Sequence, residues 1–295
     1  MRVTRLTWSI LLSASALMTP LSAGAVEFTC WSPDGVASAN AAADYWTAER
    51  IAAAIPDGET IRTLPTDGFS KGREDILPSD AERAPIDDAP YKFGGQLLYT
   101  RGGHDYTASA QFVADVNIVI GAAHSLWKGD MAASNIRFYQ GYSNGGGTLY
   151  RMDKAAVLLR WTEVADNNPS LARSQFDYSV MRTTVASAVG KYELGIDGAH
   201  VDDNVTITGY PARLDGGEYM YREIARIVVQ AGTAYDARPH PMYGGGASGG
   251  AWFVTANNVH KAVSVVSSGA LDGVYGPSFT QDTADLIAIV KNGCP

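Results

Sequence analysis

The chain has 295 residues, of which 46% are hydrophobic and 18% are charged, a composition typical of a folded protein. Acidic residues outnumber basic residues by 31 to 23, and the net charge of −8 argues against a nucleic-acid-binding surface. The length allows one large or two small domains with a hydrophobic core. The 31 glycines, 15 tyrosines and many short β-branched segments favour an all-β body.

Residues 1–25 have the pattern of a secretory signal peptide. Arg2 and Arg5 form a charged start, Leu6–Met18 is mostly apolar, and Ala23-Gly24-Ala25 fits an A-x-A cleavage site. The apolar segment is shorter than the roughly 20 residues that span a membrane. We therefore expect an exported chain, extracellular or periplasmic, that begins at Val26 and has no membrane partner.

The two cysteines, Cys30 and Cys294, stand at opposite ends of the exported chain. Export implies an oxidising compartment, in which two cysteines can pair. We expect a Cys30–Cys294 disulfide, which would close a very long loop and stabilise the fold by about 4 kcal/mol. Two free, buried thiols are the alternative.

Residues 26–89 are interpreted as a partly helical N-terminal extension. The alanine-rich segment from Ser38 to Ala54 predicts one helix, capped by Asp34 or Ser38 and ending before Pro56. The stretch from Pro56 to Pro90 alternates proline, glycine and charge without a period, which is typical of a connector rich in loops. A propeptide, a packing arm and a small recognition module are all compatible with this pattern.

Short β-type segments separated by turn signals begin after Phe93. The glycine-containing segments at 101–103 and 144–146 mark turns, and Asn257-Asn258 marks a hairpin. The predicted strands are Leu97–Tyr99, Ser109–Val113, Val116–Ala123, Ile136–Tyr139, Ala155–Leu159 and Ser179–Met181 in a first series, and Val205–Gly209, Ile224–Val229, Ala251–Val254 and Ala262–Ser267 in a second.

A final helix is predicted after Pro277, with Thr280 as its cap and Gly293 at its end. Two series of strands followed by a helix suggest two antiparallel barrels, over residues 90–185 and 186–295, with a cleft between them. The predicted fold is therefore all-β, with two six-stranded barrels, the C-terminal helix and the N-terminal extension.

A glycine-rich segment contains the best candidate nucleophile, Ser248, in Gly244-Gly245-Gly246-Ala247-Ser248-Gly249-Gly250. A serine becomes a nucleophile when its Oγ is presented in the open and a base can take its proton. Glycines beside it allow backbone N–H groups to converge on a developing oxyanion. A glycine-rich turn between strands is the structural alternative.

The best candidate base is His124, which follows the apolar segment from Asn117 to Ala123. A buried strand that delivers a histidine at its exit can fix an imidazole in the wall of a cleft, although a lone histidine is more often a satisfied core residue. The remaining histidines are interpreted as solvated loop residues: His104, His200, His240 and His260.

Asp177 is the best candidate for the carboxylate that orients the base, because it is flanked by a strand-like apolar segment. Competing acids lie in more polar stretches and are interpreted as surface charges: Asp153, Asp166, Asp202 and Asp203.

These three segments resemble the chymotrypsin-like serine proteases. Gly-Ala-Ala-His-Ser around His124 resembles that family's Thr-Ala-Ala-His-Cys, the segment at Asp177 resembles its Asp-Ile-Ala-Leu, and Gly-Ala-Ser-Gly-Gly at Ser248 resembles its Gly-Asp-Ser-Gly-Gly. The three occur in the family's chain order. The likeness is nearest to bacterial glutamyl-endopeptidase-like members and covers about residues 90–295. Further similar segments are Thr107–Ala110, Thr208–Pro211 and Val266–Gly269.

The resemblance implies a secreted serine endopeptidase with a Ser248–His124–Asp177 triad and an acyl-enzyme intermediate. The backbone N–H groups of Gly246 and Ser248 would form the oxyanion hole. Neither a metal nor an organic cofactor is required, protein or peptide substrates are the expected partners, and we expect a monomer. If residues 26–89 are a propeptide, the chain is a zymogen.

The resemblance also places a substrate-binding set at Met242, Val266, Ser267, Ser268 and Gly269. Met242 stands where basic-selective relatives carry an aspartate, and Val266 where glutamate-selective relatives carry a histidine. A neutral or apolar pocket is therefore expected. Ala247 replaces the aspartate that pairs with a freed N-terminus in trypsin-type enzymes, so that activation switch is absent.

Two other functions share features with this sequence. A non-catalytic, protease-like secreted binding protein would keep the scaffold but have a misformed oxyanion loop. A lipase or esterase also carries Gly-x-Ser-x-Gly, but places its serine before a helix and its histidine last in the chain. Here an apolar strand follows Ser248 and the best histidine precedes it, which argues against that class.

Overall fold

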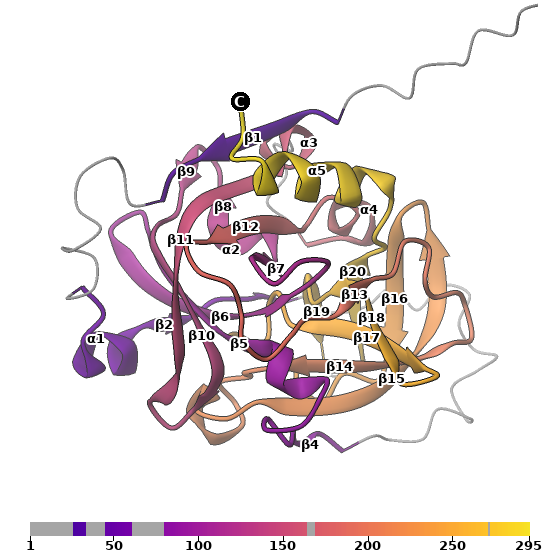
Figure 1. Cartoon of the computed structure of the whole chain (residues 1–295). Coiled ribbons are helices and arrows are strands. Elements are labelled where there is room, and N and C mark those ends of the chain that lie inside the picture. The colour runs from indigo at the N-terminus through magenta and orange to yellow at the C-terminus, as the bar shows by residue number, and fades with distance from the viewer. Residues whose placement is uncertain (1–25, 34–44, 61–79, 164–168, 271) are drawn as a thin grey trace, which may run out of the picture.

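The computed structural model describes residues 26–33, 45–60, 80–163, 169–270 and 272–295. The predicted signal peptide, residues 1–25, lies outside this part of the chain. Figure 1 shows two strand-rich halves side by side, with the yellow C-terminal helix lying across the top. Within the described part, no helix has both the length and the apolar character needed to cross a membrane.

The first half is a closed six-stranded antiparallel barrel. Its strands pair in the order β11-β10-β5-β6-β7-β12, and β12 pairs back with β11 to close the ring. Alternate side chains point inward and form an apolar core with Leu97, Phe112, Val119 and Phe138. The strands are β5 Gly94–Arg101, β6 His104–Phe112, β7 Ile118–Gly121, β10 Ser134–Ser143, β11 Gly146–Leu158 and β12 Ser179–Thr183.

The second half is a sheet whose central path is β18-β17-β14-β15-β16-β20. Its ends approach each other because Phe279, just after β20, donates its N–H to the Val263 oxygen in β18 at 3.1 Å. Trp252 is fully buried in its core. The strands are β13 Glu193–Leu194, β14 Asn204–Gly209, β15 Tyr221–Ala231, β16 Ala234–Arg238, β17 Ala251–Ala256, β18 Val259–Val265, β19 Ser268–Ala270 and β20 Gly273–Pro277.

Short elements connect these strands. Five are helical: η1 Tyr91–Phe93, α2 Ala123–Leu126, α3 Leu159–Glu163, α4 Leu171–Ser174 and η2 Asp215–Gly217. Two form a small separate hairpin: β8 Trp127–Lys128 and β9 Met131–Ala132. The one-turn helix α2 contains the candidate site residue His124, and α4 ends three residues before the candidate site residue Asp177.

The C-terminal helix α5, Gln281–Lys291, begins at Thr280 as predicted, where a capping box with Thr283 satisfies the free N–H groups of the first turn. Its buried face carries Leu286, Ile287 and Val290. These side chains belong to a core cluster with residues of both halves, such as Ile118 and Phe253, so the helix packs at their junction.

The predicted all-β fold with a C-terminal helix is confirmed. Each predicted strand falls on an observed one, and Asn257 and Asn258 both adopt positive φ in the predicted hairpin turn. No strand was predicted within residues 26–89 or at the two-residue strands β8, β9 and β13. Of the longer strands after residue 90, β16, β19 and β20 were missed. Their sequences are rich in alanine, glycine and serine, so they lack the β-branched signal on which the prediction relied.

The described parts of residues 26–89 are distributed over both halves of the molecule. β1, Phe28–Trp31, pairs with β11, and β2, Ile55–Pro56, pairs with β6. β3, Glu59–Thr60, pairs with β19, and β4, Glu82–Arg83, pairs with β15. The segment is therefore held by the sheets at four places.

The helix predicted from Ser38 to Ala54 is shorter in the described residues. α1 spans Ala48–Ala53, and its N-cap is Thr47, whose side chain accepts from the N–H of Arg50. Residues 34–44 lie outside the described part. Tyr45 and Trp46 precede the helix, and their side chains donate to Asp105 and to the Asn135 oxygen of the first barrel.

The predicted disulfide is present between Cys30 and Cys294. It joins β1, on the edge of the first barrel, to the residues just after α5. The tie therefore holds the first described strand of the extension on the same side of the molecule as the C-terminal helix, as Figure 1 shows.

Candidate active site

His124 stands in the one-turn helix α2, just after β7. β7 pairs with β6 on one side and with β12 on the other, and this pairing fixes the point at which the chain enters α2. His124 is fully buried, and its own N–H donates to Oδ1 of Asp177 at 2.8 Å. The position of its ring is thus set by the backbone as well as by the side chain.

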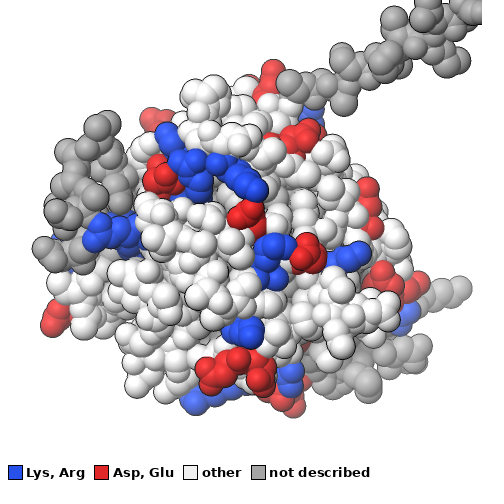
Figure 2. Space-filling model, in the orientation of Figure 1, with Lys and Arg blue, Asp and Glu red and all other residues white. Residues whose placement is uncertain are grey.

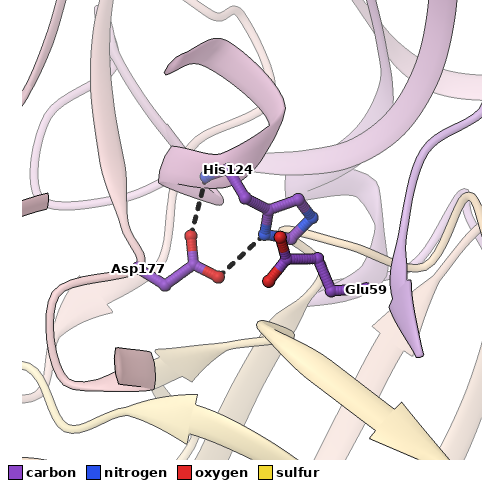
Figure 3. Close-up of side chains that lie close together, drawn as sticks. All are labelled: Glu59, His124 and Asp177. Atoms are coloured by element: carbon purple, nitrogen blue, oxygen red, sulfur yellow. Dashed lines mark hydrogen bonds and ion pairs between the residues drawn. The ribbon is translucent and has the colours of Figure 1, made fainter. Parts of the chain in front are cut away.

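Asp177 lies between α4 and β12 and is also fully buried. Its Oδ2 is 2.7 Å from Nδ1 of His124 (Figure 3). The same oxygen accepts from the Ser267 hydroxyl at 2.5 Å. Ser267 in turn lies 3.0 Å from the Ser174 hydroxyl. Burial of a carboxylate is costly unless its oxygens are hydrogen-bonded, and both oxygens of Asp177 are.

Ser248 comes from the second half, in the loop before β17, with its Oγ 2.9 Å from Nε2 of His124. With Nδ1–H donating to Asp177, Nε2 is the free acceptor for the serine hydroxyl proton. The backbone oxygen of Ser248 accepts from the N–H of Ser109 in β6 at 2.8 Å. The serine loop is therefore anchored on the first barrel, opposite His124.

The electrostatics of the pair favour its charged forms. Burial opposes the charge on Asp177, but His124 and the hydrogen bonds to His124 and Ser267 hold the pKa of Asp177 below its usual range. Burial likewise disfavours the His124 imidazolium, but the charge and the hydrogen bond of Asp177 oppose this penalty. Glu59 and Asp57 add smaller effects in the same direction as Asp177, and the pKa of His124 rises to about 8. This environment stabilises an imidazolium once it forms.

Gly246 shapes the serine loop, because its φ of 93° lies in the left-handed region and a Cβ there would be 2.2 Å from the Tyr210 oxygen. Its oxygen accepts from the Ser109 hydroxyl at 2.7 Å. Its N–H donates to the backbone oxygen of Asp57 at 2.7 Å. Gly246 thus offers a backbone donor two residues before Ser248.

The five residues predicted to bind substrate lie in different surroundings. Met242 and Val266 are buried in the apolar core of the second half. Ser267 bonds to Asp177, as described above, and Ser268 and Gly269 form β19, which pairs with β3 of the extension.

His240 was interpreted as a solvated loop residue, and this is wrong. It is only 1% exposed, with Nδ1 hydrogen-bonded to Oε1 of Glu223. Glu223 also accepts the N–H of Met242 at 2.8 Å, which draws the loop between β16 and Ser248 inward. His240 is therefore buried because it bonds to a carboxylate on β15, although its polar, proline-flanked neighbours in the sequence suggested exposure.

Several residues near the site were not identified from the sequence: Glu59, Arg173, Ser174 and Glu223. The Glu59 carboxylate accepts from Arg173 at 2.6 Å and lies beside His124 (Figure 3). Glu59 stands in the stretch rich in proline and glycine, and Arg173 in a short polar segment, so neither had a local pattern to distinguish it.

Glu59, His124 and Asp177 are also the one group of described residues whose potential ligand atoms lie within 4.8 Å of one another. Both ring nitrogens of His124 already have hydrogen-bond partners, in Asp177 and Ser248. The group is therefore accounted for by hydrogen bonding and an ion pair between Glu59 and Arg173.

No protein-family model matches the chain, and no curated protein matches its sequence. Among solved structures, the thermostable serine protease AL20 from an extremophilic microorganism is similar over 68% of this chain and 98% of its own, at 17% identity and a TM-score of 0.59. The protease Anisep from Arthrobacter nicotinovorans is similar over 71% of this chain and 99% of its own, at 22% identity and a TM-score of 0.59.

A Glu endopeptidase, solved in complex with MPD, is similar over 72% of this chain and 96% of its own, at 17% identity and a TM-score of 0.59. In all three, nearly the whole neighbour is matched, while about three tenths of this chain is not. Together with the closed barrel and the second sheet, these likenesses show that the chain has the two-barrel fold of the chymotrypsin-like serine proteases.

Proposed function

We propose that the protein is a secreted serine endopeptidase that hydrolyses peptide bonds through an acyl-enzyme. The observation that carries the proposal is the unbroken chain of contacts from Asp177 Oδ2 to His124 Nδ1, at 2.7 Å, and from His124 Nε2 to Ser248 Oγ, at 2.9 Å. Each of these two distances is within hydrogen-bonding range, as expected for a catalytic nucleophile, its base and the carboxylate that orients the base.

In the proposed mechanism, neutral His124 takes the hydroxyl proton of Ser248 as Oγ attacks the carbonyl carbon of a peptide bond. Asp177 stabilises the imidazolium that results, and His124 then gives the proton to the leaving nitrogen. A water molecule then attacks the acyl-enzyme, with His124 taking the proton of the water and giving it to Ser248 Oγ as the acyl group leaves. The N–H groups of Gly246 and Ser248 are proposed to stabilise the oxyanion, and loss of one such donor costs about 3 to 4 kcal/mol of transition-state stabilisation.

Export and processing belong to the same proposal. Residues 1–25 are proposed as a signal peptide, 26–89 as a propeptide or permanent arm of a zymogen, and 90–185 and 186–295 as the two barrel domains. The disulfide supports an oxidising compartment. On the face drawn in Figure 2, basic and acidic side chains alternate in small groups, which favours a peptide substrate over a polyanion.

The rival function is a non-catalytic binding protein on the same scaffold. It is favoured by the low exposure of Ser248, only 2%, and by the engagement of the Gly246 N–H with Asp57. The two functions differ in one property, the reactivity of Ser248 toward an electrophile.

Labelling of the exported chain with a fluorophosphonate tests this property. We expect wild type to react, and Ser248→Ala and His124→Ala to lose about 10⁶-fold in rate, because triad members act as one unit. Ser143→Ala in β10 and His104→Ala, at an exposed position, are the matched controls and should label as wild type. Absence of labelling in folded wild type, both intact and after limited proteolysis of residues 26–89, would establish the non-catalytic function instead.

A further inference from the structure

Residues 55–60 cross the candidate active site from the first half to the second. β2 adds to β6 in parallel, with Ile55 opposite Tyr106, and β3 adds to β19 in parallel, with Glu59 opposite Ser268. Between them, Asp57 donates its N–H to the Thr107 oxygen at 2.8 Å and accepts from the Gly246 N–H at 2.7 Å. The segment is therefore bound by main-chain hydrogen bonds on both sides of the serine loop.

The fit at the centre of this segment is backbone against backbone. An ideal Cβ on Gly58 would lie 2.8 Å from the Cα of Gly245, and one on Gly245 would lie 2.3 Å from the Pro56 oxygen. Contacts this close exclude a side chain at either position. The Asp57-Gly58 dipeptide and the glycine-rich loop are thus complementary in shape.

The side chain of Asp57 provides one anchor. The residue is 7% exposed; the Tyr99 hydroxyl donates to its carboxylate, and the Arg101 guanidinium lies 3.5 Å away. Arg101 also donates to the backbone oxygens of His124 and Ser125. The Asp57 anchor is therefore connected through Arg101 to α2, the helix that carries the candidate base.

The side chain of Glu59 provides a second anchor on the other side of the loop. It is 5% exposed and accepts from Nη1 of Arg173 at 2.6 Å, with Nζ of Lys128 at 3.6 Å. The Arg173 guanidinium is held at 4.1 Å over the ring of Trp161. Figure 3 shows the Glu59 carboxylate beside the His124 ring.

We propose that the surface formed by β6, the serine loop and β19, here called the groove, is a binding site for an acidic peptide strand. Tyr99 and Arg101 recognise an aspartate of that strand, and Arg173 recognises a glutamate. Residues 55–60 fill the groove in cis as a built-in inhibitor. The inhibitory part of this inference rests on the proposed endopeptidase function. Removal of the segment would leave the buried guanidinium groups of Arg101 and Arg173 without their carboxylates, which is costly. Only a strand of similar charge replaces it well.

The charge of the segment would also protect it from cleavage by the candidate triad. Glu59 and Asp57 contribute to the raised pKa of His124, and a protonated Nε2 has no lone pair with which to take the proton of Ser248. Ser248 itself is only 2% exposed while the segment is in place. The Cys30–Cys294 disulfide would keep residues 55–60 attached to the molecule after a cut that follows residue 60.

The first arm of the test measures fluorophosphonate labelling of the full exported chain. Gly58→Val removes the shape fit without touching a charge, and the double variant Asp57→Asn/Glu59→Gln removes both anchors. Each is expected to raise the labelling rate by about tenfold or more, because the open state becomes more populated. Glu49→Gln, an exposed acid in α1 outside the groove, is the matched control and should label as wild type.

The second arm does not depend on catalysis. A fluorescent peptide Ile-Pro-Asp-Gly-Glu-Thr is titrated against the Ser248→Ala/Gly58→Val chain, beside the peptide Ile-Pro-Asn-Gly-Gln-Thr, with anisotropy as the readout. We expect the acidic peptide to bind at least about tenfold more tightly, and Arg173→Gln to remove most of that difference.

The two arms separate the two hypotheses. Equal labelling of wild type and both groove variants, with no difference between the peptides, would overturn the inference and leave the endopeptidase function standing. Selective binding of the acidic peptide without labelling of any variant would support the site and overturn the proposed function. Intact mass of purified wild type should show an unbroken Asp57–Gly58 bond, and a cut there would identify the segment as a substrate.

Discussion

The molecule contains two buried histidine–carboxylate pairs with nearly the same local construction. In each, the imidazole Nδ1 meets a carboxylate, His124 with Asp177 and His240 with Glu223. In each, the second carboxylate oxygen accepts a backbone N–H, of His124 at 2.8 Å and of Met242 at 2.8 Å. Both histidines are at most 1% exposed.

The pairs differ in what faces the other side of the ring. Nε2 of His124 faces the hydroxyl of Ser248, whereas the His240 ring lies against Gly269, where an added Cβ would be 2.6 Å from Cδ2. The first pair lies where the two halves meet, and both members of the second belong to the second half. A buried histidine–carboxylate pair is therefore a way to fix a loop, and it becomes a candidate catalytic device only when a nucleophile is delivered from elsewhere.

The comparison is tested most strongly by neutralising the two carboxylates. Asp177→Asn would leave the geometry of the site nearly intact but favour the wrong tautomer of His124, and we expect fluorophosphonate labelling to fall by about 10⁴-fold. Glu223→Gln is the matched change in the second pair and should alter labelling by less than about tenfold. Similar losses in both would show that the pairs are functionally equivalent, contrary to this assignment.

The second pair should instead affect folding. Glu223→Ala removes the hydrogen-bond partners of the His240 ring and of the Met242 N–H together, and a buried polar group left without a partner costs about 1 to 3 kcal/mol. We expect a loss of this size in the free energy of unfolding, measured by urea denaturation. A loss below about 1 kcal/mol would mean that the loop before Ser248 is held by other contacts.

Much of the fold followed from local patterns. Alternating β-branched segments, turn glycines and the Thr280 cap predicted most of the longer strands and the final helix, because each is a property of a few neighbouring residues. The strands with small side chains, such as β19, were missed. Their position depends on pairing with β20 and β3, which no local pattern encodes.

The candidate site shows the same division. His124, Asp177 and Ser248 each stand in a recognisable segment, and the structure brings the three together. Glu59 and Arg173 are separated by 114 positions and meet only because the extension crosses the serine loop. His240 was misread because its partner, Glu223, lies on another strand. Contacts between distant segments were the part that the sequence did not disclose.

The smallest predicted effect concerns the pH dependence of the first pair. The pKa of His124 is raised from 6.5 to about 8, so its ionic interaction contributes fully below about pH 6.5 and is lost as the pH rises through about 8. The groups that act on the ring are Asp177, Glu59 and Asp57, with Arg101 bonded to the His124 oxygen. A shift of this size corresponds to about 2 kcal/mol.

The measurement compares the free energy of unfolding of wild type and His124→Gln between pH 6 and pH 9. Wild type should lose about 2 kcal/mol relative to the variant over this range, because only wild type carries the imidazolium. His104→Gln, at an exposed position, is the matched control and should follow wild type throughout. A difference that stays constant, or grows with pH, would mean that His124 is neutral in the folded chain, in which case the segment around Glu59 adds no charge effect to its shape fit.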